Sequence, residues 1–179
     1  MCSSDLTMAH AGMGSVSQVT CQLFNSILGL SPKQAAYQGS GPAMTALKAG
    51  EVDYMCCQAI TVVPEAKADS IQIYTVATPA RSPALPEIPT SREAGLQQFE
   101  VSAWNAIFAP RHTPQPIIAR LNDAAAKALA DPGIKQKLVD LAQDIFPREQ
   151  LTPQALLAFH KAEIGKWWPI IKAAGIKAE

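Results

Sequence analysis

Two glycine-rich turns constrain what this chain can fold into, because each lies between a short apolar run and a helical pattern. The first turn, residues 11–15 (AGMGS), follows residues 7–10 (TMAH). The second turn, residues 39–42 (GSGP), follows residues 35–37 (AAY). Glycine reaches positive φ values, and serine and proline are favoured at the first positions of helices. The sequence therefore predicts two helices that begin directly after strands, with backbone N–H groups of their first turns left without partners.

The residues around these turns predict a repeated order of strand and helix. Residues 16–28 place apolar side chains at i, i+3, i+4 and i+7, and Gly29 ends this helical pattern. A second helix is predicted over residues 42–49, and further strands over residues 52–57 and 71–77. Strands joined through helices form parallel sheets, which bind ligands at the carboxyl ends of their strands. We therefore expect an α/β fold with both glycine turns at the ligand-binding edge of a parallel sheet.

The two predicted turns suit an anionic ligand. Free N–H groups and the helix dipole both favour a carboxylate or phosphate oxygen at a helix N-terminus. Neither turn has the G-x-x-x-x-G-K-[ST] spacing of a phosphate loop, and the pair Gly12 and Gly14 lacks the third glycine of a dinucleotide motif. A small carboxylate is therefore the expected ligand, and the alternative for each turn is a capped helix that binds nothing.

Composition and charge argue against several classes of partner. With 48% hydrophobic and 17% charged residues the chain resembles a globular protein, and its 15 basic residues balance 15 acidic ones. Without a cluster of Lys and Arg we expect no nucleic-acid partner, and without an apolar run of about 18 residues we expect no membrane insertion. His10, His112 and His160 lack the spacing of metal ligands, so we predict no metal and no cofactor.

The second half of the chain changes from strand-like to helical patterns. Residues 99–109 (FEVSAWNAIFA) form the longest extended pattern, and we predict a hinge strand that crosses between two lobes. A mid-strand amide is costly unless it is hydrogen-bonded, so Asn105 is predicted to contact a ligand. A short strand is predicted over residues 144–147. Helices are predicted over residues 116–130, 132–142 and 153–174.

Three of the four cysteines carry further chemical possibilities. Cys56 and Cys57 are adjacent, so on a strand they point to opposite faces. A disulfide between Cys21 and Cys56 would link the first helix to the third strand in an exported protein, and the alternative is three small buried hydrophobic side chains. Cys57 with His10 as its base would make an enzyme for a small acyl or carboxylate substrate, which is the alternative to a binding protein.

Several longer segments carry a resemblance to a known family. They are AGMGSVSQVT, YQGSGPAMTALKAGEVDYMC, ATPARSPALPEIPTSREAGL, FEVSAWNAIFAP and KWWPIIKAAGIKAE. Together they resemble the Bug, or TctC-like, family of substrate-binding proteins, over nearly everything after Leu6. The resemblance implies a periplasmic receptor of a tripartite tricarboxylate transporter, which works with the membrane components of that transporter. It also implies the two-lobed, clamshell-like type II periplasmic binding protein fold, closed over a small organic carboxylate.

The resemblance also implies which residues contact the ligand. The ligand loops of the family match this chain at Gly12, Gly14, Ser15, Ser17, Tyr37, Gly39, Ser40 and Gly41. This chain departs from the family pattern at Gln18, where histidine is frequent, and at Cys57, where aspartate or asparagine is common near the pocket. Cys57 is therefore included among the predicted ligand contacts, and no residue is assigned a catalytic role under this interpretation.

Family members are longer at the N-terminus, so the resemblance implies a truncated chain. We predict a non-native leader over residues 1–6, a largely complete ligand-binding lobe over residues 7–98 and a hinge over residues 99–109. Residues 110–179 would then be the mainly helical part of an incomplete second lobe with exposed apolar faces. A ligand-sensing lobe of a transcription regulator shares this architecture and is a further alternative, although no helix-turn-helix pattern or basic face supports it.

Overall fold

The computed structural model of the chain describes residues 5–173 and residue 175. Its sheet consists of three short parallel strands in the order β2-β1-β3. They are β1 (Thr7–His10), β2 (Lys33–Ala36) and β3 (Tyr54–Met55). His10 lies opposite Ala36, so β1 and β2 end at the same level. Because all pairs are parallel, as predicted, the strands end at one edge of the sheet, which we call the carboxyl edge.

The first two helices follow the predicted glycine turns. Helix α1 (Val16–Leu28) ends at Gly29, which has the left-handed conformation with φ 64° that glycine adopts without strain. Helix α2 (Ser40–Lys48) begins two residues earlier than predicted, because Ser40 and not Pro42 is its first residue and Gly39 precedes it. Pro42 is therefore the third helical residue, where its missing N–H would also have lacked a partner.

Helices α1 and α2 pack on opposite faces of the sheet. On the α1 face, Asn25 donates from Nδ2 to Met8 Sδ and accepts from Tyr54 Oη at 2.6 Å. On the other face, α2 contributes Ala43 and Ala46 to a buried cluster with Ala9 and Val52. The successive residues Met8 and Ala9 of β1 therefore point toward different helices, as the period of a strand requires. This doubly wound arrangement places β1 between the two directions in which the chain crosses the sheet.

A third helix, α3 (Ala59–Lys67), was not predicted. Its segment contains Pro64 and a run of β-branched residues, both of which disfavour helices. Tertiary packing outweighs these preferences, because Val62 and Val63 are buried in a cluster with Leu85. The predicted strand over residues 52–57 is correspondingly shorter, since only Tyr54 and Met55 pair with β1.

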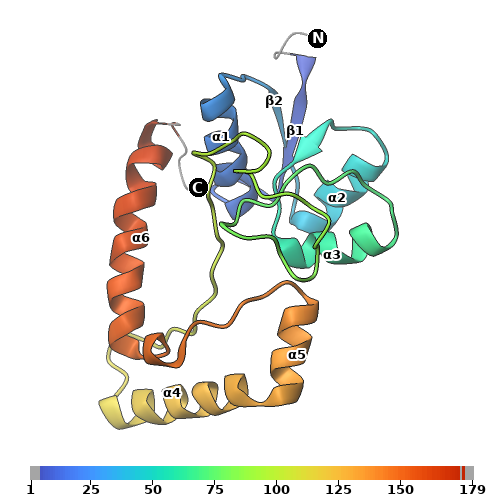
Figure 1. The fold of residues 1–179 in the computed structure, drawn as a ribbon. Coiled ribbons are helices and arrows are strands. Elements are labelled where there is room, and N and C mark those ends of the chain that lie inside the picture. Colours follow the sequence, from blue (N-terminus) through green and yellow to red (C-terminus); the bar gives the residue numbers. More distant parts are fainter. Residues whose placement is uncertain (1–4, 174, 176–179) are drawn as a thin grey trace.

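The predicted strands over residues 71–77, 99–109 and 144–147 are wrong. Between α3 and Pro114 the structure contains only an isolated bridge that joins Val76 to Thr90. Val101 donates its N–H to Ala77 O at 2.9 Å, but no ladder of strand bonds follows. Extended patterns become strands only where another strand supplies partners, and no strand of the described chain does so here. Residues 99–109 instead form an irregular connection from the sheet to the C-terminal helices (Figure 1).

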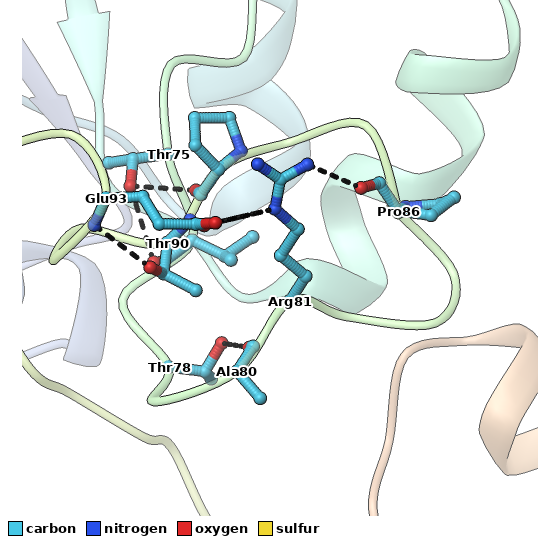
Figure 2. Close-up of polar contacts among 9 residues, drawn as sticks. Thr75, Thr78, Ala80, Arg81, Pro86, Thr90 and Glu93 are labelled. Carbon is cyan, nitrogen blue, oxygen red and sulfur yellow. Dashed lines mark hydrogen bonds and ion pairs between the residues drawn. The ribbon is translucent and has the colours of Figure 1, made fainter.

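A polar cluster holds part of this irregular segment together (Figure 2). Arg81 donates from Nε to both carboxylate oxygens of Glu93, at 3.2 and 3.0 Å, and from Nη1 to Pro86 O at 3.1 Å. Glu93 accepts the Thr90 N–H at 2.7 Å, while its own N–H donates to Thr90 Oγ1 at 3.2 Å. This reciprocal pair has the pattern of a capping box. It closes a turn to which Arg81 connects the proline-rich loop.

The pKa of the Glu93 carboxyl group should depend on Arg81. Hydrogen bonds from Arg81, followed by the Thr90 N–H, lower the pKa of Glu93 to about 2. The stabilising effect of this low pKa is complete above the ordinary glutamate value of 4.5 and is lost as the pH falls toward 2. In Arg81→Gln, we expect NMR titration of the Glu93 carboxyl carbon to show a pKa closer to 4.5. Arg92→Gln is the matched control, because Arg92 pairs with Glu100; equal Glu93 titration in all three proteins would contradict the prediction.

The C-terminal helices lie apart from the sheet, and the last of them runs back beside it in the view of Figure 1. They are α4 (Gln115–Ala130), α5 (Pro132–Asp140), the short 3₁₀ helix η2 (Arg148–Gln150) and α6 (Pro153–Ala173). In α4 and α5, which are described in full, no residue is buried. Apolar side chains stay exposed on these helices, among them Ile117, Leu121, Ile164 and Trp168. The exposed apolar helix faces expected from the sequence are therefore present.

One carboxylate joins the irregular connection to the last helix. Glu163 Oε2 accepts the indole N–H of Trp104 at 3.3 Å and that of Trp167 at 3.0 Å. The Trp104 ring also packs edge-on against Phe159 and His160. Residues near 104 are therefore held against α6 by both polar and aromatic contacts.

Among the helices that the structure describes, none is long and apolar enough to cross a membrane.

Candidate ligand-binding site

The carboxyl edge of the sheet brings three helix N-termini together. Each of β1, β2 and β3 leads within a few residues into α1, α2 or α3. The first two turns are tied to each other, because Tyr37 donates its N–H to His10 O at 2.9 Å. A Cβ atom on Gly12 would lie 3.6 Å from Tyr37 O, so the backbones of the two turns approach closely. Doubly wound sheets bind ligands at the carboxyl ends of their strands, where the chain changes direction.

The first turn is organised by side chains that bind its own backbone. Ser17 Oγ accepts the Ala11 N–H at 2.9 Å, and Ser15 Oγ accepts the Gln18 N–H at 3.3 Å. Gln18 Oε1 accepts the Gly14 N–H at 2.7 Å, so this donor is already occupied. Gly14 therefore contributes its left-handed backbone, with φ 71°, more than a free N–H group. Of the two serines in this turn, Ser15 is the one that caps α1.

Gln18 is a positioning residue whose contacts were missed. Its side chain is buried, and Nε2 donates to Gln34 Oε1 at 3.1 Å and to Met13 Sδ. Because Gln34 is on β2, the Gln18 amide fixes the first turn to the neighbouring strand. A signal was present in the sequence, since serine followed three residues later by glutamine is a capping-box pattern. Here the glutamine reaches the N–H one residue before the capping serine.

The second turn leaves its donors more open. Gly39 precedes α2 with φ 114° and ψ 171°, a conformation that other residues rarely adopt, and no side chain caps this helix. The N–H groups of Ser40 and Gly41 belong to the first turn of α2, where no helical carbonyl can accept them. Ser40 is half-buried beside them. Two N–H groups and a hydroxyl therefore lie at this helix N-terminus.

A third N-terminus joins the site because of the unpredicted helix α3. Gln58 precedes α3 and makes no side-chain cap, so the first N–H groups of this helix also lack a cap. The sequences at the three helix starts, residues 11–18, 37–42 and 56–61, contain no charged side chain. Within the part of the chain that the structure describes, no group of three or more His, Cys, Asp or Glu side chains could hold a metal. These three helix starts can therefore attract an anion through dipoles, N–H groups and neutral side chains.

The structure separates the two adjacent cysteines. Cys56 is joined to Cys21 of α1 by a disulfide, which is the pairing considered from the sequence. Cys57 is half-buried and packs against the cluster that contains Val62 and Val63 of α3. Burial raises the pKa of Cys57 to about 11, so its thiol is protonated at neutral pH.

His10 is not arranged as a base for Cys57. The side chain is 1% exposed, and its Nδ1 lies 3.0 Å from Gly12 O. A carbonyl oxygen only accepts, so Nδ1 carries the hydrogen and donates it to Gly12. His10 therefore supports the first turn from within the sheet. A thiol with a raised pKa is mostly protonated, and among the described residues no hydrogen bond joins His10 to Cys57, so the two do not form a catalytic pair.

The raised pKa of Cys57 predicts slow alkylation. A change from 9.0 to about 11 lowers the thiolate fraction near pH 8 about 100-fold, and thiolate is the reactive form. A more basic thiolate is also a stronger nucleophile, so we expect iodoacetamide to label Cys57 about 10-fold to 100-fold more slowly in the folded chain than in the same chain unfolded in urea without reductant. Peptide mass spectrometry should follow this residue alone, because the chain contains other cysteines. Equal labelling rates in the two states would show an accessible, reactive thiol.

Asn105 is far in sequence from the residues of the two glycine turns. It is exposed and belongs to the irregular segment of residues 99–109, not to a strand. An amide inside a strand is costly unless it is hydrogen-bonded, but Asn105 is outside any strand, so this argument for a ligand contact does not apply. Its contact with a ligand stays a prediction.

Comparisons with known proteins agree with this fold. A family model described as "Tripartite tricarboxylate transporter family receptor" (TctC) matches residues 2–176. An Agrobacterium vitis protein, the UPF0065 protein in the TAR-I ttuE-ttuC' intergenic region, is 38% identical over 95% of this chain. The structure of MatC (Rpa3494) from Rhodopseudomonas palustris with bound malate is similar over 94% of the chain, with a TM-score of 0.89 and 41% identity. The periplasmic binding protein BugD is similar over 98%, with a TM-score of 0.90 and 30% identity.

The matched proteins are longer than this chain. It spans 49% of the Agrobacterium protein, 57% of MatC and 59% of BugD. The family match starts within residues 1–6, and Leu6 O accepts the Lys33 N–H at 2.8 Å beside the sheet. A non-native leader and the lobe boundaries stay predictions. The matched family and the similar structures are solute-binding proteins, and not enzymes. The chain therefore belongs to the TctC family, the receptor family of tripartite tricarboxylate transporters.

Proposed function

We propose that this chain forms the ligand-binding lobe of a receptor for a small organic dicarboxylate. One observation supports the proposal most directly. The N-termini of α1 and α2, which carry no charged side chains, lie side by side at the carboxyl edge, and a hydrogen bond from the Tyr37 N–H to His10 O connects the two turns. Two helix N-termini can each favour one carboxylate group of a dianion. The similarity to the malate-bound MatC protein supports a ligand of this chemistry.

The predicted ligand contacts fall into donors and residues that shape the turns. Backbone N–H groups at the start of α2, with the Ser40 hydroxyl, are proposed to hold one carboxylate. The first turn of α1 is proposed to hold the other, with Gly12 and Gly14 giving the backbone its path. Cys57 would offer a neutral thiol near α3. The full proposed set is Gly12, Gly14, Ser15, Ser17, Tyr37, Gly39, Ser40, Gly41, Cys57 and Asn105.

Location and partners follow from the same proposal. We infer a periplasmic receptor that delivers its ligand to the membrane components of a tripartite tricarboxylate transporter. The Cys21–Cys56 disulfide supports an oxidising compartment such as the periplasm. The residues at the three helix starts, which would face the ligand, carry no charge. The specificity of the receptor at these residues would therefore depend on hydrogen-bond geometry and not on an arginine.

Calorimetry and thermal unfolding with malate, adipate and citrate test the proposal. The full-length product of the gene and the 179-residue chain should be measured in parallel. A ligand at 100 times its Kd should stabilise the receptor by about 2.7 kcal/mol. Because these helix starts contain no carboxylate, histidine, lysine or arginine, affinity should fall as the carboxyl groups of the ligand become protonated, below about pH 5.

The neutral diamide of malic acid is the matched ligand control. It keeps the size of malate but removes both negative charges, so we expect no measurable binding. Binding of the diamide as tight as that of malate would contradict an anion site. Absence of binding by any of the acids to the full-length product would remove the proposed function.

A further inference from the structure

The first residues of the irregular connection are fixed to the part of the molecule that contains the sheet. Phe99 is 5% exposed, and its ring packs edge-on against Phe24 of α1, with 5.4 Å between the ring centroids. Phe99 O accepts the Ser91 hydroxyl. Val101 is buried too, and its N–H donates to Ala77 O at 2.9 Å. The connection therefore stays with the sheet as far as Val101.

The later residues of the connection are fixed to α6 instead. Trp104 donates its indole N–H to Glu163 Oε2 at 3.3 Å. Its ring packs edge-on against Phe159 and His160, with centroids 5.3 and 5.9 Å away. Phe108 packs against the same His160 ring at 5.7 Å. The connection is thus attached to α6 at Trp104 and again at Phe108.

Only Ser102 and Ala103 lie between these two sets of contacts. Both are exposed, and neither makes a hydrogen bond or an ion pair with any other described residue. Each residue has two soft backbone dihedral angles, so this pair can change the direction of the chain without breaking a contact. Exposed backbone without buried contacts is also where a folded chain opens at the lowest cost.

We propose that the chain bends at Ser102 and Ala103, and that Glu163 is the positioning residue that confines the bend to them. Residues before the bend move with the sheet, and residues after it move with α6. The hinge predicted over residues 99–109 is thereby narrowed to two residues. The bend follows from contacts outside the candidate ligand site, so it does not depend on the proposed function.

One carboxylate oxygen explains the role of Glu163. Oε2 accepts the indole N–H of Trp167 at 3.0 Å as well as that of Trp104. Trp167 is one turn later in α6, so it orients the Glu163 side chain from within the same helix. Trp104 is 59 residues away in sequence, so its bond attaches the connection to that helix. Loss of the carboxylate weakens this attachment and lets the bend spread beyond Ala103.

Residual dipolar couplings measured by NMR on the full-length product of the gene test where the chain bends. Couplings from residues 99–101 should fit the alignment tensor of α1. Couplings from residues 104–108 should fit a different tensor, that of α6. One tensor for both groups would show that the chain does not bend between them. Agreement of residues 104–108 with the tensor of α1, or with neither tensor, would place the flexible part elsewhere. Each of these outcomes overturns the inference.

Variants at Glu163 test its role as a positioning residue. In Glu163→Ala, residues 104–108 should no longer fit the α6 tensor, and solvent exchange of the Trp104 indole N–H should be about 10-fold faster, because a hydrogen bond to a charged group is lost. Glu163→Gln keeps an acceptor oxygen and should restore most of the protection. Glu149→Ala removes an exposed carboxylate of η2 and should change neither readout. Wild-type couplings and exchange in Glu163→Ala would overturn the role of Glu163.

Two glycine substitutions test the bend without changing Glu163. Glycine widens the range of backbone conformations. Ala103→Gly should therefore lower the alignment amplitude of α6 relative to that of α1, whereas Ala106→Gly, between the attachments at Trp104 and Phe108, should leave this ratio unchanged. Equal ratios in the two variants would overturn the inference. None of these measurements needs a ligand, so failure to bind any of the acids would count against the proposed function alone.

Discussion

Loss of the Cys21–Cys56 disulfide is expected to lower the free energy of unfolding by about 4 kcal/mol. The bond joins residues 35 positions apart, and a loop of that size restricts the unfolded chain considerably. It also connects α1 directly to the end of β3, across the face that carries Asn25 and Tyr54. We expect Cys56→Ser to show this loss in urea unfolding followed by circular dichroism.

Cys57→Ser is the matched control for the disulfide. It changes the adjacent residue and leaves the Cys21–Cys56 bond in place, so it should cost much less than Cys56→Ser. Peptide mapping without reductant should find Cys21 and Cys56 in one linked peptide pair in the wild type and in the control. Equal stability of Cys56→Ser and Cys57→Ser would count against a structural disulfide.

The second large effect is expected for Gly39→Ala. Gly39 has φ 114° and ψ 171°, and nothing lies within 4 Å of a Cβ built there, so the cost is backbone strain and not a clash. Strain of this kind costs about 1–3 kcal/mol. Relief of the strain would rotate the N–H groups at the start of α2, so carboxylate affinity should fall as well. Thermal unfolding and malate calorimetry on one preparation measure both effects.

Gly41→Ala adds the same methyl group two residues later. Gly41 is within α2, has no positive φ and also has open space around its Cβ position. Alanine in a helix stabilises by about 0.5–1 kcal/mol relative to glycine. The two variants should therefore change stability in opposite directions. A loss in Gly41→Ala as large as that in Gly39→Ala would show that bulk, and not backbone conformation, is limiting at the second turn.

Local signals predicted those parts of the fold that depend on neighbouring residues. Gly29 ends α1, and α5 and α6 begin at Pro132 and Pro153, as predicted. Each signal acts through the backbone within about one helical turn. The parallel order followed because a helix lies between successive strands.

Signals that need a distant partner failed. The pattern of residues 99–109 predicted a strand, but no described strand lies beside it to accept its hydrogen bonds. Conversely, the segment of α3 has poor helix formers, yet Val62 and Val63 are buried against Leu85 from a loop more than 20 residues away by the numbering. Burial of apolar area outweighs the smaller propensity terms.

In the candidate site, too, some features follow from local sequence signals and others from contacts between residues distant in sequence. The sequence by itself determined that residues 11–15 and 39–42 begin helices after strands, because glycine and serine act there on their own backbone. Only the tertiary structure decided that the two turns lie side by side, that α3 adds a third N-terminus, and that Ser17 and Gln18 are buried. Those features depend on which strands pair and which faces are covered, and contacts between residues distant in sequence determine both.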